Sequence, residues 1–445
     1  MRRGWVTVVL AATLASCVHY TPAPPRPEVF PAALAARRLD EKPAGAAWGA
    51  ADLLAAALAR NPQVAEARVR YLTAVSAART ARLSPGLTLT LTAEYADERP
   101  RWGGGGAADL PLDTGGRRAT RLTTADLQAL QAWYDYGEAA WAVRTALTKA
   151  RAERASARVE FGLAKRAVDL RLERSLRLDQ RVAAGEDDRT QGLSARKDLA
   201  DSQRRWADAG GRDEAANIAL AKALGVGPDA VRELVVAPEP ELPMTVPTEW
   251  RRDAALSRSD VLRAMADYDL AEAALRLEVA KQYPEVRLGP GYMYDHGVNK
   301  LPFNLSLALP TYDLNQRAIV QAEAARAAAG RSLERVQADA LAAVDTALEA
   351  LVTARAGADY ARTNALPAAR RAAANAARAM RAGAADRIDA LAAEAAEIDA
   401  ELSVLDGQRA TAAALADFED AVRRAFDPTE TAVLETALTR PGGAK

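Results

Sequence analysis

The stretch LPFNLSLALPTYDLNQR, residues Leu301–Arg317, decides the fold because it has the pattern of a strand that ends at a turn and leads directly into a long helix. Five large apolar side chains share one face of its first ten positions, and these are Leu301, Phe303, Leu305, Leu307 and Leu309. The run from Val286 to Tyr294 alternates in the same way, and the DHGVNK segment between the two runs is typical of a loop. Together they predict a β-hairpin, whose apolar face must pack on another layer, on copies of itself or on lipid.

The N-terminus predicts export. Two arginines precede an apolar run, Trp5 to Ala15, which is too short to cross a bilayer as a helix but fits a secretory signal. The run ends in Leu-Ala-Ser-Cys, which resembles the lipobox of bacterial lipoproteins, and Cys17 is the only cysteine of the sequence. We expect residues 1–16 to be a signal peptide and Cys17 to carry lipid, including palmitate, with an unmodified cysteine as the alternative. Val18 stands where an aspartate would retain a lipoprotein at the inner membrane, so this resemblance implies an outer-membrane anchor.

The composition excludes some classes of function. The chain has 445 residues with 59 basic and 59 acidic side chains, so its net charge gives no electrostatic sign of nucleic-acid binding. Alanine dominates the apolar residues and there are only five phenylalanines, which favours closely packed helices. No run after residue 18 resembles a membrane-spanning helix, so a membrane crossing would have to use strands.

Segments of the first half of the chain recur in the second half at an offset of 198 to 200 residues. The recurring pairs include Ala57–Arg60 with Ala255–Arg258, Leu110–Pro111 with Leu309–Pro310, Arg117 with Arg317, and Gly185 with Gly383. The chain is therefore expected to hold two copies of one design. The expected divisions are a signal peptide (1–16), a lipid-anchored tether (17–50), a first repeat (51–224), a linker (225–250), a second repeat (251–424) and a C-terminal tail (425–445).

Each copy is predicted to run as helix, hairpin, long helix, tight turn and helix. The first helix is expected over Asp52–Leu83, with Asp52 as its cap. A clear strand is predicted from Leu87 to Tyr95. Four consecutive glycines, Gly103–Gly106, predict a flexible loop tip followed by a short or poorly defined return strand.

Two very long helices are predicted, Gly116–Ala184 and Leu314–Ala382, each roughly 100 Å long at 1.5 Å per residue. The second carries two apolar stripes about 100° apart, which favours packing on neighbours at both sides and a ring of helices. Pro367 is expected to kink it. Both end at an alanine–glycine turn followed by an aspartate that can cap a returning helix of about 36 residues, Arg189–Leu224 and Arg387–Arg424.

Several of these features together resemble the TolC family of outer-membrane efflux channels over about residues 51–424. They are the order of elements, the ALxRNP motif near Leu58, the Leu-Pro-to-Asp junctions at Asp113 and Asp313, the YDLNQRAI segment, and the turns at Gly185 and Gly383. The resemblance implies a mostly helical fold with a transmembrane β-barrel. In that family each chain of a homotrimer adds four strands to one twelve-stranded barrel, and a coiled-coil tunnel extends into the periplasm.

The resemblance also implies where partners and solutes meet the chain. A periplasmic adaptor would contact the helix turns, at Gly185, Glu186, Asp187, Gly383, Ala384 and Asp386. Asp389 matches one of two aspartates that ring the tunnel mouth in some members, whereas Ala392 stands at the other position and Met380 stands where a tyrosine is common. An acidic ring there would act as a periplasmic gate.

No motif for chemistry was found in the sequence. The two histidines lie far apart, the only cysteine lies at the signal cleavage site, and neither a metal-ligand spacing nor a phosphate loop nor a nucleophile motif is present. We therefore expect no enzyme activity, no cofactor and no metal site. The function predicted is a passive exit duct for drugs or metal cations, joined to an adaptor and an inner-membrane pump. A duct for type I protein secretion and a periplasmic coiled-coil scaffold or adaptor remain as alternatives.

Overall fold

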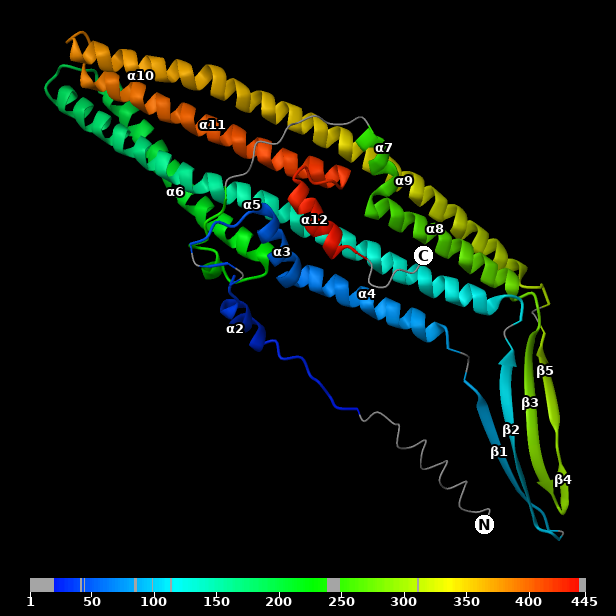
Figure 1. Cartoon of the computed structure of the whole chain (residues 1–445). Coiled ribbons are helices and arrows are strands. Elements are labelled where there is room, and N and C mark those ends of the chain that lie inside the picture. Colours follow the sequence, from blue (N-terminus) through cyan, green and yellow to red (C-terminus); the bar gives the residue numbers. More distant parts are fainter. Residues whose placement is uncertain are drawn as a thin grey trace.

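Two long helical hairpins lie side by side and form an elongated body, with an antiparallel sheet projecting from one end (Figure 1). The computed structural model describes residues 20–40, 42–43, 45–83, 86–97, 99–112, 114–237, 249–309 and 312–439. Cys17 and Asp113, both singled out from the sequence, lie outside this set. None of the helices within the described ranges is both long enough and apolar enough to cross a bilayer.

The element order repeats once along the chain. The first part holds α2 (Val29–Ala36), α3 (Ala50–Arg60), α4 (Pro62–Ala81), β1 (Thr88–Tyr95), β2 (Trp102–Leu112), α5 (Arg117–Ala183), α6 (Arg189–Leu224) and a short 3-10 turn, Pro228–Ala230. The second part holds α7 (Glu249–Ser257), α8 (Ser259–Ala280), β3 (Glu285–Asp295), β4 (Val298–Lys300), β5 (Phe303–Ala308), α9 (Gln316–Tyr360), α10 (Leu366–Arg381), α11 (Arg387–Val422) and α12 (Pro428–Ala437). The predicted order of helix, hairpin, long helix, turn and helix is confirmed in both parts.

The long helices match the sequence prediction closely. α5 has 67 residues, and α6 and α11 have 36 residues each. α9 packs on α8 around Arg326 and on α11 around Ala358, one after the other along its length, so the ring of helices expected from its two apolar stripes stays a prediction. The kink predicted at Pro367 takes the form of a π-helical turn, Ala361–Ala365, which ends just before α10 begins.

One predicted helix is divided. A single helix was expected over Asp52–Leu83, but the structure has two helices, α3 and α4. They are separated at Asn61, whose backbone is extended because the next residue is Pro62. The Asn61 side chain accepts a hydrogen bond from Gln63 N at 2.9 Å and so caps α4. Asp52 is not the N-cap of α3; it lies in the first turn, where its carboxylate accepts a hydrogen bond from Gly49 N at 2.9 Å. The second repeat breaks at the matching place, Arg258.

The sheet has the order β1-β2-β3-β4, and β5 also pairs with β3. The fourth strand, predicted to begin at Leu301, begins at Phe303 as β5, since Pro302 has no N–H for the ladder, and residues 298–300 of the predicted loop form β4. The loop expected between the last two strands is only a tight turn, with φ of 44° at His296 and 103° at Gly297. The strand from Glu285 to Asp295 forms as predicted.

The expectation for the four glycines was wrong. Gly103–Gly106 lie within β2, an 11-residue strand that pairs with β1 on one side and with β3 on the other. The strands approach so closely there that a Cβ on Gly105 would lie 2.2 Å from the carbonyl oxygen of Tyr292. Glycine is required by this close contact between strands, and not by loop flexibility.

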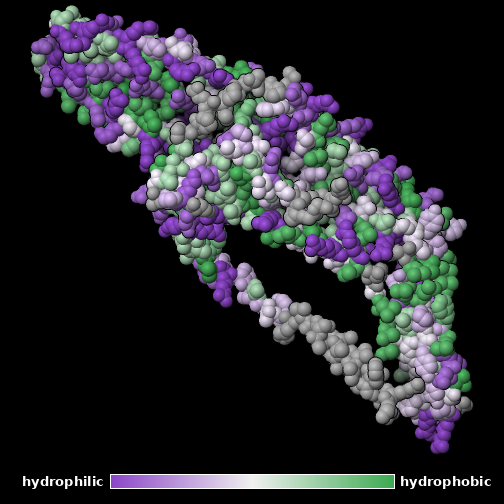
Figure 2. All heavy atoms as spheres, in the orientation of Figure 1, coloured by the Kyte–Doolittle hydropathy of each residue, from purple (hydrophilic) through white to green (hydrophobic). Residues whose placement is uncertain are grey.

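The register gives the sheet one apolar face. Leu89 pairs with Ala108, Leu110 with Leu288, and Leu288 with Leu305, so their side chains lie on the same side. The opposite face carries small or polar residues, among them Thr90, Asp109, Arg287, Asn304 and Ser306. Figure 2 shows hydrophobic residues gathered over the sheet, and hydrophilic ones at the end farthest from the helices.

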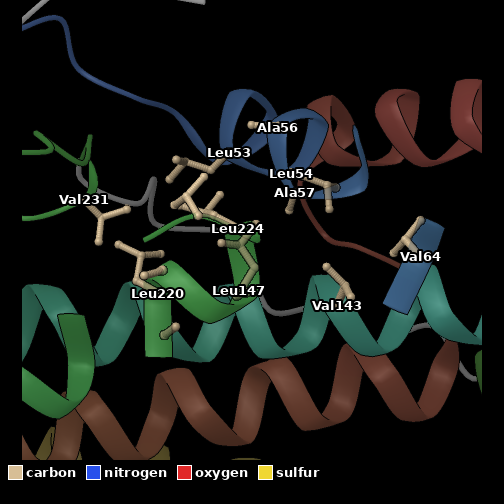
Figure 3. Close-up of a cluster of buried hydrophobic side chains, with 14 of the residues drawn as sticks. Leu53, Leu54, Ala56, Ala57, Val64, Val143, Leu147, Leu220, Leu224 and Val231 are labelled. Atoms are coloured by element: carbon tan, nitrogen blue, oxygen red, sulfur yellow. The ribbon is translucent and has the colours of Figure 1, made fainter. Parts of the chain in front are cut away.

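The hydrophobic core lies midway along the helical body. Leu53 and Leu54 of α3 pack against Val143 and Leu147 of α5, and Leu220 and Leu224 of α6 close the cluster (Figure 3). A second, smaller cluster joins α7, α9 and the end of α11 around Phe418 and Leu351. The first core belongs to the first hairpin and the second core to the second, and the two hairpins meet where α5 packs on α8 and α11.

Candidate functional site

The two helix turns lie together at the end of the body farthest from the sheet (Figure 1). Gly185 and Gly383 are left-handed, with φ of 75° and 73°. In each turn the residue after the glycine donates its backbone N–H to a carbonyl one turn back, Glu186 N to Arg181 O at 2.9 Å and Ala384 N to Ala379 O at 2.9 Å. The predicted glycine caps are confirmed, and the two turns have the same backbone hydrogen bonds.

Aspartates cap both returning helices, as predicted. Asp188 accepts a hydrogen bond from Thr190 N at 3.1 Å, and Asp386 accepts one from Asp389 N at 2.9 Å. These backbone N–H groups favour the ionised carboxylate, so they hold the pKa of Asp188 and of Asp386 below the ordinary value. Both caps are therefore charged at neutral pH.

An added side chain at either glycine would have open space around it. A Cβ built on Gly185 or Gly383 meets no atom of the described residues within 4 Å. Neither glycine is needed for packing within one chain, and the left-handed backbone alone accounts for the residue type. The surface around both turns is thus available to another molecule.

Ion pairs join the first hairpin to the second near the turns. Arg181 of α5 contacts Asp187 at 2.7 Å and also Asp386, the cap of α11. Arg387 of α11 contacts Glu173 of α5 at 3.2 Å and Glu394 of its own helix at 2.8 Å. The Arg387 guanidinium holds the pKa of Glu173 below its usual range. These partners could not be predicted from the sequence, because residues about 200 positions apart meet only in the folded chain.

Asp389 is exposed on the first turn of α11. No ion pair to its carboxylate is seen among the described residues, whereas the neighbouring Arg387 is occupied by Glu173 and Glu394. Arg387 therefore does not neutralise Asp389 directly. Ala396, Ser403 and Ala410 follow Asp389 at intervals of seven residues and are also exposed. On this line along α11, the acidic side chain is therefore found only at the end near the turn.

A buried charge cluster in the middle of the body was also missed. Arg144 of α5 is 2% exposed and contacts Glu430 of α12 at 2.6 Å and Glu419 of α11 at 2.8 Å. Arg151 contacts the same Glu430 at 3.2 Å. Burial raises the pKa of Glu419 despite the nearby guanidinium. The segment after residue 424, expected to be a tail, thus supplies a helix that is tied to α5 and α11.

No set of three or more His, Cys, Asp and Glu side chains in the described ranges could hold a metal ion. His296 contacts only its neighbour Asp295 at 2.8 Å, in the tight turn of the sheet. The features that stand out are instead a sheet with two unlike faces, long helices and two exposed turns.

A comparison with protein families gives a match in the first half of the chain. Residues 53–226 match the model of the family described as outer membrane efflux protein. The chain carries an outer membrane efflux protein domain. Efflux proteins of this family are channels and not enzymes. The resemblance to TolC-like efflux channels inferred from the sequence is confirmed, and so is the mostly helical fold class with long coiled coils and an antiparallel sheet.

Solved structures extend the likeness in fold beyond the matched domain. A membrane protein from Pseudomonas aeruginosa aligns with 20% identity over 84% of this chain and 90% of that one, with a TM-score of 0.71. The outer membrane protein VceC from Vibrio cholerae aligns with 21% identity over 85% and 97%, with a TM-score of 0.68. The open state of the MtrE outer membrane channel from Neisseria gonorrhoeae aligns with 20% identity over 84% and 89%, also at 0.68. No curated protein sequence gave a match.

Proposed function

We propose that three copies of this chain form an outer-membrane channel, the passive exit duct of a tripartite efflux system. The observation that carries the proposal is the sheet register, which puts the large apolar side chains on one face and small or polar ones on the other. Such a sheet fits lipid outside and water inside. In the described residues β1 pairs only with β2, and β5 pairs only with β3, so both edges can pair with further copies. If β4 and β5 are taken together as one strand, each chain supplies four strands, and three chains would close a twelve-stranded barrel.

The helices would continue this barrel as a periplasmic tunnel, open to small solutes such as drugs or metal cations. Energy would come from an inner-membrane pump, joined to the duct through an adaptor. Cell fractionation tests the assembly, because the chain should be recovered in the outer membrane and crosslink as a trimer. Recovery as a soluble periplasmic monomer would favour the scaffold alternative.

The proposed lipid anchor at Cys17 can be tested separately. Cys17→Ser should abolish lipid attachment and still allow trimers to form, because the strands themselves would span the membrane. Mass spectrometry of the mature wild-type N-terminus is the measurement. An unmodified cysteine, or a mature chain that starts far from residue 17, would contradict the proposal.

The two helix turns are the proposed contact with the adaptor, through Gly185, Glu186 and Asp187 in one and Gly383, Ala384 and Asp386 in the other. Replacing Gly185 and Gly383 together with leucine should lower adaptor crosslinking and efflux, because each side chain would project from the exposed turn and strain its left-handed backbone. Gly162→Leu in the α5 shaft is the matched control, since it also has open space but no positive φ. If crosslinking survives in the double variant, the glycines serve only as helix caps.

Asp389 is the proposed periplasmic gate residue. It lies six residues past Gly383, in the first turn of α11, and a trimer would place three such carboxylates around the mouth of the tunnel. Asp389→Ala should reduce cation selectivity and block by multivalent cations, both measured in a planar bilayer. Asp406→Ala removes an exposed carboxylate from the same helix far from the turn and should leave both quantities unchanged. An Asp389→Ala channel with the wild-type reversal potential would exclude this role.

A further inference from the structure

The helices next to the sheet form one row, in the order α4, α5, α8 and α9 (Figure 1). α4 and α5 belong to the first repeat, and α8 and α9 belong to the second, so the contact between α5 and α8 joins the two repeats. The sheet has the same order, with β1 and β2 from the first repeat and β3 and β5 from the second. α4 and α9 therefore lie at opposite ends of the row, as β1 and β5 lie at the edges of the sheet.

α5 covers one side of α8. Arg263 of α8 contacts Asp135 of α5 at 2.7 Å, which identifies the side of α8 that is covered. Ala266 lies one turn further along that side and Ala273 two turns beyond it, and they are 2% and 3% exposed. At these alanines, the side of α8 that faces the first repeat is closed to solvent.

α4 is the counterpart of α8 in the first repeat. Each helix follows a residue with an extended backbone, Asn61 before α4 and Arg258 before α8, and these two residues are 197 positions apart. The same offset relates Val64 to Val261, both of which are almost fully buried. An offset of 197 residues therefore gives the equivalent positions of the two helices.

The corresponding side of α4 is open. Val69 and Ser76 stand at the positions of Ala266 and Ala273, yet Val69 is 62% exposed and Ser76 is exposed as well. Single exposed apolar residues are common on protein surfaces, but here another helix buries the equivalent positions of the second repeat. The difference indicates that α4 lacks a neighbour that α8 has.

α9 offers the matching surface. It is the counterpart of α5, because each begins after a residue in the left-handed conformation, Gly116 before α5 and Asn315 before α9. α5 packs on α8 of the other repeat, whereas the main contacts of α9 in the described part of the chain are with its own repeat. A line of exposed residues at three- and four-residue spacing along α9 consists of Val320, Ala324, Ala328, Arg331, Arg335 and Ala338. Half of them are alanines, which let a second helix approach closely, so this line can receive Val69.

The charged side chains on the two surfaces balance. Arginines and carboxylates pair along each helix: Glu66 with Arg70 at 2.5 Å, Arg331 with Glu334 at 2.8 Å, and Arg335 with Asp339 at 2.7 Å. Exposed pairs of this kind are weak and can exchange partners across a contact. Because these charges cancel, they do not oppose the approach of another helix, and the apolar positions carry the contact.

We propose that α4 of one copy of the chain packs on α9 of the next copy, as α8 packs on α5 within the chain. The inference rests on the proposed trimeric duct, and it names the two helix surfaces that hold its copies together. Because the contact joins two different surfaces, it is repeated from copy to copy and ends only when a ring closes. Val69 fills the position of Ala266 in this contact.

The contact within the chain gives the register of the contact between copies. Gln131 of α5 donates a hydrogen bond to Asp267 of α8. The counterparts of these two residues, from the offsets between the helix starts, are Gly330 of α9 and Arg70 of α4. Gly330 of one copy should therefore lie level with Arg70 of the next.

Cysteine crosslinking of the purified full chain in nonionic detergent tests the contact. Val69→Cys and Ala328→Cys, each within one turn of this level, are combined in a Cys17→Ser background. A short bismaleimide should shift most of the protein to a three-copy band on a denaturing gel, and neither single cysteine should do so. Ala342→Cys in place of Ala328→Cys is the matched control, because Ala342 is exposed and lies about 21 Å further along α9 at 1.5 Å per residue.

Val69→Asp should convert trimers to monomers, measured by light scattering after size exclusion, since a carboxylate would be buried in the contact. Leu72→Asp is its control, because Leu72 is 50% exposed on the same helix but is equivalent to Asp269, which stays exposed on α8. Equal effects of the two substitutions, or no crosslink from Val69→Cys with Ala328→Cys, would overturn the inference. Conductance separates the two claims. A conducting trimer without this crosslink refutes the contact between α4 and α9 alone, whereas crosslinked copies that do not conduct refute the duct.

Discussion

Arg144→Leu should lower the free energy of unfolding by about 3–5 kcal/mol, the cost typical of removing one partner from a buried ion pair. Arg144 is almost fully buried and contacts two carboxylates, Glu419 and Glu430, from two different helices. Its guanidinium also lies over the ring of Trp141, at 5.6 Å from the centroid. Without the guanidinium, two like charges would remain close together in the interior, and α12 would lose its main link to α5.

The pH dependence of this variant identifies the cause. Burial already raises the pKa of Glu419, and loss of Arg144 should raise it further. A carboxyl group whose pKa is higher in the folded chain favours folding when it is protonated, and this contribution is lost as pH rises through the folded-state value. The destabilisation by Arg144→Leu should therefore be smaller at pH 5 than at pH 8. The destabilisation at each pH can be measured by thermal unfolding followed by circular dichroism.

Arg166→Leu is the matched control for this experiment. Arg166 lies on the same helix, is 65% exposed and is 3.9 Å from Glu401, so its loss should change stability little. In the Arg144→Leu background, Glu419→Gln should restore part of the stability, because it removes the buried carboxylate that has lost its guanidinium, whereas Glu430 still contacts Arg151. An equal loss at both pH values, with no rescue by this glutamine, would show that packing and not charge is responsible.

Gly105→Val should prevent β2 from pairing with β3. A Cβ at this position would lie 2.2 Å from the carbonyl oxygen of Tyr292 and 2.8 Å from the Cα of Met293, both of which are backbone atoms that cannot rotate away. β2 is paired on both sides, so separating it from β3 would divide the sheet in two. The folded protein should be largely lost, and limited proteolysis should cut within residues 86–112.

Gly86→Val serves as the comparison for Gly105→Val, since a Cβ on Gly86, just before β1, meets nothing within 4 Å. It should resist protease as the wild type does. Wild-type protease resistance in Gly105→Val would mean that the strands can move apart at this point, and the requirement for glycine would then be refuted.

The regular parts of this fold could be predicted because the sequence repeats its own signals. Alternation from Val286 to Tyr294 predicted β3, and the turns at Gly185 and Gly383 predicted where two 36-residue helices begin. These signals are local, because each depends on the backbone conformation at a turn or on the alternation of side chains along a strand. The same logic predicted two faces for the sheet before its register was known.

The failed expectations involve contacts between distant segments. Gly103–Gly106 look like a loop in isolation, and only pairing with both β1 and β3 explains them. The Asp52 expectation failed for a local reason instead, because the chain enters α3 two residues earlier. Arg181, Arg144 and Arg117 find their carboxylates on other elements, so periodicity along one helix gave no sign of them.

Conductance of the purified chain in a planar lipid bilayer tests the channel most directly. If three copies close a barrel with the polar sheet face inside, reconstituted protein should give uniform, ion-conducting steps, and Gly105→Val should give none. Protein that inserts as folded trimers without any conductance, or that remains monomeric and does not insert at all, would contradict the account.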